Sequence, residues 1–155
     1  MITIEEARSL YEGADAIHDF DHVLRVLALA ERLAREEGAD LEIVRTATLL
    51  HDVARGKADR LTTDHAQAGA EFARRFLDGH PPEKVEAVVH AIAAHRFRSA
   101  PAPQTLEAKV LHDADKLDAI GAIGVARAFA FGGHEGQHLW ADVPHDYHES
   151  PETAC

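Results

Sequence analysis

Apolar residues recur every three or four positions along most of this chain, and this spacing constrains its fold more than any other feature. Spacing of three and four places side chains on one face of an α-helix. Between residues 19 and 37, for example, apolar residues recur at such intervals at Val23, Val26, Leu27, Ala30 and Leu33. Strand-like alternation does not persist beyond a few residues, and β-branched residues are not clustered. The pattern therefore predicts an all-α fold.

Residues that favour helix ends divide this pattern into seven helices. Thr3, with Glu6 three residues later, forms a capping box at the first helix. Asp40 is a suitable N-cap for the third helix, and Pro81 and Pro82 suit the first turn of the fifth. We predict helices over residues 3–13, 19–37, 40–55, 63–79 (with Thr63 or Asp64 as the first residue), 81–97, 105–117 and 120–131.

The 155 residues are enough for one domain, and no linker or internal repeat divides them. The helical pattern breaks at Gly132-Gly133, so we assign residues 1–133 to a helical domain and 134–155 to a C-terminal tail. The tail is polar and non-periodic, although Ser150-Pro151-Glu152 is a well-formed helix start. Because the chain stops about one turn later, we expect a shortened sequence.

The charge balance argues against several classes of partner. Asp and Glu number 27 against 16 Lys and Arg, which gives a net charge of −11 with histidine neutral. A nucleic-acid duplex requires a basic face, and anionic membranes attract polybasic segments. We therefore expect neither as a partner. The single cysteine, Cys155, allows no disulfide, and no apolar stretch approaches the about 18 residues of a membrane span. These features fit a cytoplasmic protein.

Histidine is unusually frequent, with 12 residues in the chain. Three predicted helices direct imidazole or carboxylate groups toward one core, through His22, the pair His51-Asp52, and Asp115. Such charged groups are rarely buried unless they are paired or bind a metal. Two imidazoles and two carboxylates, without a thiolate, suit a divalent metal ion such as Mn²⁺, Mg²⁺, Fe²⁺ or Zn²⁺.

Three segments resemble the HD-domain metal-dependent phosphohydrolases, over about residues 15 to 133. They are HDFDHVLRV at residues 18–26, ATLLHDVAR at 47–55 and LEAKVLHDADKLDAIGAIG at 106–124. The last segment is similar to a small bacterial subgroup with a DADxLDAIGAIG signature. The resemblance implies an all-α HD-domain helical bundle of about six to seven helices.

The resemblance also implies the ligands and the reaction. By it, His22, His51, Asp52 and Asp115 hold the metal, and the metal-bound water attacks phosphorus. The substrates of the family are typically nucleotides or other phosphate esters and anhydrides. We therefore expect a small phosphorylated substrate, a nucleotide above all.

Three cationic residues near these ligands are candidates for holding phosphate. Arg25 lies one turn after His22, Arg55 follows Asp52, and Lys116 is adjacent to Asp115. A guanidinium group matches the oxygens of a phosphate with two parallel hydrogen bonds. The alternative for all three is a solvated helix end or a salt bridge to one of the many acids.

Three further histidines are candidates for roles around the metal. His65 and His95 fall where some HD relatives hold a second metal, with the first aspartate bridging the two ions. Contact with substrate is the alternative for both, and His65 could also be explained as a helix cap. His18 lies one turn before His22 and faces the same way, as a proton carrier or a partner of that ligand would. Asp118 is expected to be a structural hydrogen-bonding residue.

Two other functions fit parts of this pattern. An HD-type oxygenase with two irons would require His65 and His95 both to be ligands, and bound iron with a visible absorption band would identify it. A catalytically inactive HD domain would instead act as a ligand-sensing module. The complete ligand set argues against that module, and failure to turn over any nucleotide with added Mn²⁺ would support it.

The last predicted helix also bears on self-association. If later helices normally cover it, their absence exposes apolar groups such as Ile123, Ala126 and Phe129. Exposed apolar patches favour association. We therefore expect a homodimer, or aggregation, in spite of the net charge of −11.

Overall fold

The computed structural model describes residues 1–11, 20–55, 64–96, 101–140 and 142. These residues contain helices and no strand, so the prediction of an all-α fold is confirmed. The helices are α1 (Ile4–Leu10), α2 (Phe20–Glu37), α3 (Leu41–Leu50), α4 (His65–Phe76), α5 (Pro82–Ala93), α6 (Leu106–Asp118) and α7 (Gly121–His134). None of these helices combines the length and the apolar character that crossing a bilayer requires.

Side-chain caps fix where several helices begin. At α1, the Thr3 hydroxyl accepts from the backbone N–H of Glu6, whose carboxylate accepts from the backbone N–H of Thr3. Asp40 caps α3 and Asp64 caps α4, each by accepting backbone N–H groups of the first turn. Such a cap contributes about 1 kcal/mol. The starts that the sequence predicts at these residues are confirmed.

Several helices end earlier than the sequence predicts, and the difference is largest for α3 and α5. α3 ends at Leu50 rather than near Arg55, and α5 ends at Ala93 rather than near residue 97. After α3 the chain continues in tight turns, in which the N–H of Val53 donates to the carbonyl of Leu50 and that of Arg55 to Asp52. Both ends therefore carry a histidine just beyond the last helical turn.

The last helix is longer than predicted. α7 passes through Gly132 and Gly133 to His134, so the expected break at the glycine pair is wrong. A glycine inside a helix costs about 1 kcal/mol, which weakens a helix without ending it. The predicted helix start at residues 150–152 lies outside the described residues, and the division at residue 133 stays a prediction.

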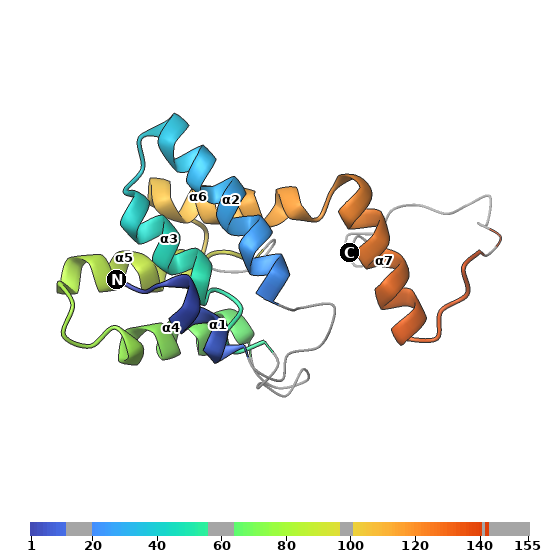
Figure 1. Cartoon of the computed structure of the whole chain (residues 1–155), viewed down its shortest axis with the longest axis horizontal. Coiled ribbons are helices and arrows are strands. Elements are labelled where there is room, and N and C mark those ends of the chain that lie inside the picture. The colour runs from blue at the N-terminus through green and yellow to red at the C-terminus, as the bar shows by residue number, and fades with distance from the viewer. Residues whose placement is uncertain (12–19, 56–63, 97–100, 141, 143–155) are drawn as a thin grey trace.

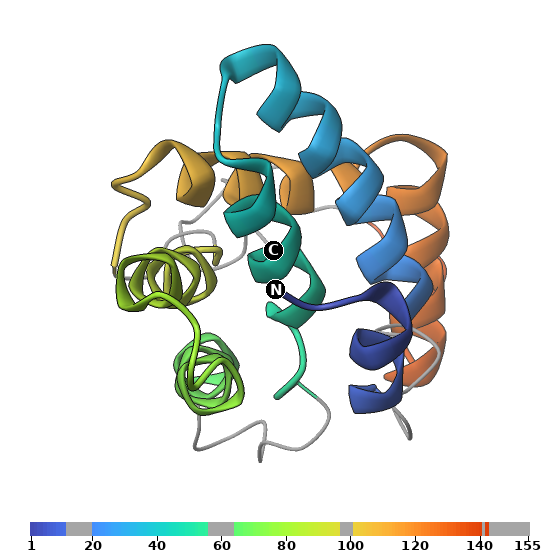
Figure 2. The ribbon, with the colours of Figure 1, turned by 60° about the vertical axis from the view of Figure 1, so that its left-hand side comes forward.

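The core forms where α2, α3, α5 and α6 meet. α2 packs against α3 and α6, while α5 packs against α3, α4 and α6. Figure 1 shows α3 among these elements, and Figure 2 shows α4 and α5 nearly end-on, one beside the other. The largest fully buried apolar side chains come from α3, α5 and α6 and from the residue after α4. They are Leu49, Leu50, Leu77, Ile92 and Leu111.

A glycine lets α4 approach the end of α3 closely. A Cβ atom at Gly69 would lie 3.2 Å from the carbonyl oxygen of His51 and 3.4 Å from Cγ2 of Ile92. The distance to the carbonyl oxygen is tighter than an ordinary Cβ contact, so a side chain at this position would displace its neighbour. The approach brings the first residue of α4, His65, next to the turn that carries Asp52.

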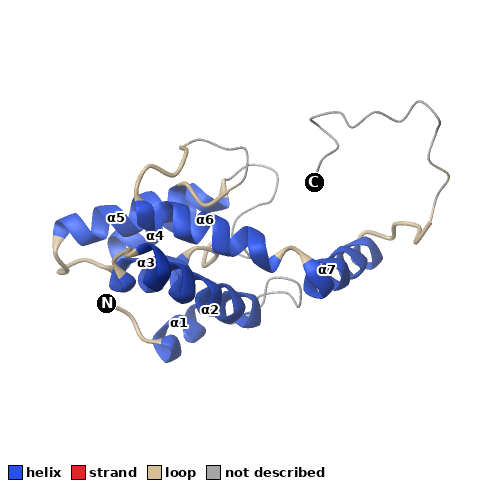
Figure 3. Ribbon diagram, turned by 90° about the horizontal axis from the view of Figure 1, so that it is seen from above, coloured by secondary structure: helices blue, strands red, loops and turns tan. Residues whose placement is uncertain are grey.

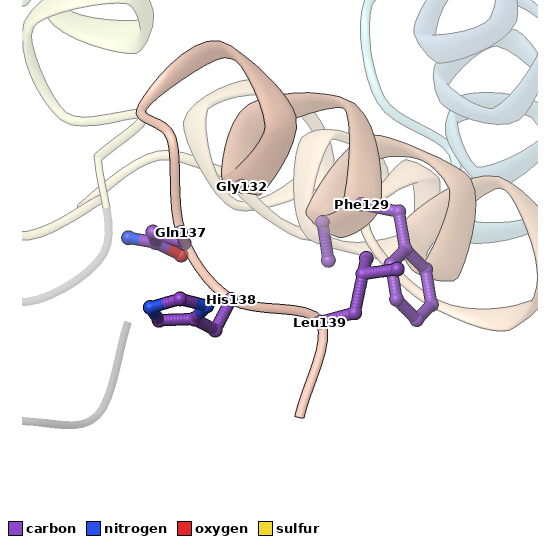
Figure 4. Close-up of a pocket in the computed structure, with 6 residues that line it drawn as sticks. Phe129, Gly132, Gln137, His138 and Leu139 are labelled. Atoms are coloured by element: carbon purple, nitrogen blue, oxygen red, sulfur yellow. The ribbon is translucent and has the colours of Figure 1, made fainter. Parts of the chain in front are cut away.

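α7 stands apart from this core. It packs mainly against α6, none of its residues is buried, and Figures 1 and 3 show it to one side of the other helices. Beyond it the chain folds back, and the N–H of Gln137 donates to the carbonyl of Gly132 at 2.8 Å. A small, open pocket of about 170 Å³ lies there. Figure 4 shows Phe129 and Leu139 side by side among the residues that line it.

Candidate metal centre and adjoining pocket

Three histidines among the described residues are buried, and they surround one buried carboxylate. Nε2 of His22, His51 and His95 lies 3.9, 3.6 and 3.7 Å, respectively, from a carboxylate oxygen of Asp52. Asp115 adds a second carboxylate, with Oδ1 3.3 Å from Nε2 of His22. The four residues predicted as metal ligands therefore lie in one cluster, together with His95. Their role as ligands stays a prediction.

The ends of α3 and α5 orient two of these imidazoles. Nδ1 of His51 lies 2.7 Å from the carbonyl oxygen of Thr48, and Nδ1 of His95 lies 2.6 Å from that of Ile92. The last carbonyls of a helix lack intrahelical partners, so an imidazole three residues later can satisfy one. Because a carbonyl only accepts, Nδ1 is the donor in each ring. Nε2 then keeps its lone pair on the side of Asp52.

The charges in the cluster suit a cation. Burial disfavours the ionised form of Asp52, but the positive charges around it, of His51 when protonated and of Arg55, together outweigh burial and hold the pKa of Asp52 well below its usual range. Burial is likewise outweighed at Asp115, where the hydrogen bond with His22 lowers the pKa. Burial lowers the pKa of His95 to about 4. Ionised carboxylates and a neutral imidazole are the forms that bind metals.

Two buried atoms in the cluster indicate that a ligand belongs there. Nε2 of His51 and Oδ1 of Asp52 have no hydrogen-bond partner among the described residues. An unsatisfied buried polar group costs about 1–3 kcal/mol and requires an explanation in a native structure. His22, His51 and Asp52 offer ligand atoms within 4.8 Å of one another. These residues therefore fit a divalent metal ion of the type that imidazole and carboxylate donors select.

A second group of ligand atoms shares the same carboxylate. Asp52, His65 and His95 also offer atoms within 4.8 Å of one another, and Nε2 of His65 lies 3.9 Å from Oδ1 of Asp52. Burial lowers the pKa of His65, and the charge of Arg55 lowers it further. The two histidines predicted to lie near the metal site are thus beside it.

A basic pocket adjoins the cluster. It has a volume of about 360 Å³, and its walls include His65, His95 and Asp115. The cationic side chains that line it, among the described residues, are Arg55, Arg96, Lys116 and Arg127. The chain as a whole has a net charge of −11, so this group of positive side chains is a local exception. It favours an anionic ligand next to the metal cluster.

Two of the three predicted phosphate-binding residues line this pocket. Arg55 Nη1 donates to Asp52 Oδ2 at 3.0 Å, and Lys116 Nζ donates to Asp115 Oδ2 at 2.6 Å. Arg25 is not among the residues that line the pocket. It donates through Nε and Nη2 to Asp118, at 2.8 and 3.1 Å. This contact is the salt bridge predicted from the sequence as the alternative to phosphate binding.

Two residues that line the pocket, Arg96 and Arg127, were not predicted from the sequence. Arg96 follows His95 directly, and that adjacency could have identified it. Arg127 lies on α7, nine positions after Asp118, and no local pattern marks it. His18 lies outside the described residues.

Comparison with known protein families gives a match across most of the chain. The sequence profile of the HD domain family matches residues 19–120. The uncharacterized protein YpgQ of Bacillus subtilis is 39% identical over 144 residues, which cover 90% of this chain and 69% of YpgQ. Ribonuclease Y of Chloroflexus aurantiacus is 40% identical over 96 residues, which cover 62% of this chain and 17% of that enzyme.

Solved structures give a similar result. A predicted HD superfamily hydrolase from an uncultured Thermotogales bacterium superposes with a TM-score of 0.71 at 37% identity, covering 83% of this chain and 72% of its own. Bacillus subtilis YpgQ in complex with ADP superposes with a TM-score of 0.69 at 36% identity, covering 90% of this chain and 68% of its own. Both structures are thus similar to this chain in sequence as well as in fold.

Proposed function

This chain belongs to the HD domain family, and we propose that it is a phosphohydrolase that uses a divalent metal to cleave a small phosphate ester or anhydride. The observation that carries the proposal is a buried histidine–carboxylate cluster beside a basic pocket. The relatives support a metal-dependent hydrolase of the HD type. The positive charge of the pocket supports a phosphate as the group that is cleaved.

In the proposed mechanism His22, His51, Asp52 and Asp115 hold the metal. A bound divalent cation supplies a nucleophile by lowering the pKa of water from about 15.7 to roughly 7, and it polarises the phosphoryl group. The side chains of the chain then orient the substrate. Charge-assisted hydrogen bonds from a guanidinium or ammonium group are well suited to the phosphate oxygens.

Arg55 and Lys116 are placed to connect the metal cluster with the substrate. Each donates to a carboxylate of the cluster, Arg55 to Asp52 and Lys116 to Asp115, and each also lines the pocket. A phosphate in the pocket would therefore meet cations that are already oriented by the ligands. Such pre-orientation stabilises a transition state without reorganisation during the reaction.

Nucleotides are the substrate class that we favour. The related YpgQ is known in complex with ADP. In this chain the pocket of about 360 Å³ gathers four cationic side chains, which suits a substrate with more than one phosphate. Arg96 and Arg127 would extend phosphate binding away from the metal cluster.

Removal of Asp52 tests the metal site directly. Asp52 is the carboxylate shared by both clusters, so without it a dication would meet fewer anionic donors. Elemental analysis of Asp52→Ala should give a metal content near background after purification in Mn²⁺. The matched control is Asp113→Ala, an exposed aspartate of α6 whose variant should keep the wild-type content. Wild-type-like metal content in Asp52→Ala would refute the ligand assignment.

A substrate panel tests the reaction. Nucleoside mono-, di- and triphosphates are offered with Mn²⁺, Mg²⁺, Fe²⁺ or Zn²⁺, and released phosphate and pyrophosphate are measured separately. Turnover of at least one compound, lost in Asp52→Ala, is the expected result. Metal binding without turnover of any compound would instead support the ligand-sensing module.

The shared carboxylate favours a second candidate, an oxygenase with two irons. His65 and His95 with Asp52 form a second ligand group beside the first. This candidate predicts two irons per chain and a visible absorption band, both reduced in His65→Ala. A single bound metal without such a band would eliminate it.

A further inference from the structure

Asp118, the last residue of α6, gathers hydrogen bonds from two other helices. Its Oδ2 lies 2.7 Å from Nδ1 of His22 on α2. Its two oxygens also accept from Nε and Nη2 of Arg25, at 2.8 and 3.1 Å. Arg127 on α7 donates to Oδ2 at 3.3 Å. The carboxylate is itself only 4% exposed, so these groups satisfy it within the protein.

His22 differs from the other two buried histidines in what holds its ring. His51 and His95 each follow a helix and use a backbone carbonyl three residues earlier. His22 instead lies in the first turn of α2, which begins at Phe20. A helix leaves N–H groups without partners at its start and carbonyls only at its end. His22 therefore needs an acceptor from elsewhere in the chain.

We propose that Asp118 is the positioning residue that supplies this acceptor and aims Nε2 of His22 at the metal. The inference rests on the proposed metal-dependent function. An ionised carboxylate only accepts, so Nδ1 donates to Asp118 and Nε2 faces Asp52 and Asp115, where a bound metal would take its lone pair. Partners of this kind fix the orientation and the basicity of metal-bound imidazoles.

Arg25 and Arg127 have a supporting role in this arrangement. The two-point contact of Arg25 fixes the plane of the Asp118 carboxylate, because the guanidinium fork matches both oxygens. Arg127 also lines the basic pocket, so one carboxylate links the pocket to His22. Asp118 thus makes the orientation of a ligand on α2 depend on α6 and α7.

The decisive variant is Asp118→Asn, measured by calorimetric titration with Mn²⁺ alone. An amide keeps the size of the side chain but replaces one acceptor oxygen with an N–H₂ donor. Its single oxygen cannot accept from His22 and from both nitrogens of Arg25, and without a negative charge it is a weaker acceptor for Nδ1 of His22. The Kd for Mn²⁺ should rise by about 10–100-fold, with the circular dichroism spectrum retained. Asp113→Asn, on the exposed side of α6, should leave the Kd unchanged.

A spectroscopic measurement tests the same point without a variant. In the zinc-loaded wild-type protein, nitrogen-15 NMR should find the proton of His22 on Nδ1, in slow exchange with water. Zinc bound through Nδ1, or a proton on Nε2, would overturn the inference even if Asp118→Asn did not fold. In a folded Asp118→Asn, wild-type affinity for Mn²⁺ would overturn it as well. A wild-type protein that binds no metal would refute the proposed function itself.

Discussion

The consecutive helices α6 and α7 have opposite relations to the rest of the molecule. α6 carries many charged residues, yet it buries Ala108, Val110, Leu111, Ala114 and Asp118. α7 is richer in apolar residues, yet it buries none of its side chains. The difference lies in their neighbours, because α6 packs against α2, α3 and α5, whereas α7 packs mainly against α6 (Figure 3). Burial here follows from position in the bundle rather than from composition.

This contrast extends to chemistry. α6 contributes Asp115 and Lys116 to the cluster and pocket, and Asp118 to the orientation of His22. α7 contributes Arg127 to the same region, while apolar side chains such as Phe129 remain exposed. The well-packed helix therefore bears the groups that need fixed geometry, and the outer helix adds charge at the edge.

The close junction between α6 and α7 places Arg127 at the pocket. A Cβ atom at Gly124 would lie 2.2 Å from the carbonyl oxygen of Ala119, too close for any side chain. Gly121 adopts φ +66°, which glycine tolerates far better than other residues. These two glycines allow α7 to begin directly after α6, and Arg127 thereby reaches Asp118.

The largest expected effect is a difference in stability between the core helices that pack against α6 and the outer helix α7. Ile92→Ala removes a fully buried side chain of α5 and should lower the free energy of unfolding by about 2–5 kcal/mol. Ile123→Ala makes the same chemical change on α7, where the side chain is 43% exposed, and should change it by no more than about 0.5 kcal/mol. Urea denaturation followed by circular dichroism measures both. Equal losses would show that α7 is as well packed as α5.

The helix starts and the composition of the cluster were predictable because both depend on local signals. Thr3, Asp40 and Asp64 cap helices through contacts within a few residues. His22 and Asp115 are inward-facing polar residues on apolar helix faces, and the periodicity alone indicates that they meet in the core. Such local patterns can be recognised without any knowledge of the tertiary structure.

Contacts between distant parts of the chain could not be predicted from local patterns. Arg25 is a candidate for phosphate because it lies one turn after His22, and the structure adds that its Nε and Nη2 donate to Asp118, which is distant in sequence. Arg127 reaches the pocket only because α7 begins so close to α6. The early end of α3 depends on tight turns after Leu50, which helical spacing does not reveal.

A smaller effect tests whether α7 belongs to the site. Arg127→Met removes the one described cation that α7 contributes to the pocket and keeps an apolar stem. At saturating Mn²⁺ we expect KM for the preferred nucleotide to rise about tenfold, which corresponds to about 1.4 kcal/mol. Arg32→Met, at an exposed arginine of α2, is the control and should leave KM unchanged. An unchanged KM in Arg127→Met would restrict the site to the core helices.

The smallest expected effect concerns the outer face of α7. Phe129 is 56% exposed there and lies beside Leu139, and a second copy of the chain could cover both (Figure 4). We expect weak, concentration-dependent dimerisation by sedimentation and light scattering. Phe129→Ser should raise the dimer Kd about fivefold, since losing part of a buried aromatic contact costs on the order of 1 kcal/mol. Phe76→Ser, at an exposed phenylalanine of α4, should not raise it.

The outcome bears on why α7 tolerates so much exposed apolar surface. If dimerisation weakens in Phe129→Ser alone, the face is a contact between copies, and Arg127 on the same helix is held at the pocket by that contact as well as by Asp118. A strictly monomeric wild-type protein would contradict this. The Arg127–Asp118 hydrogen bond and the glycine junction would then hold α7 against the end of α6.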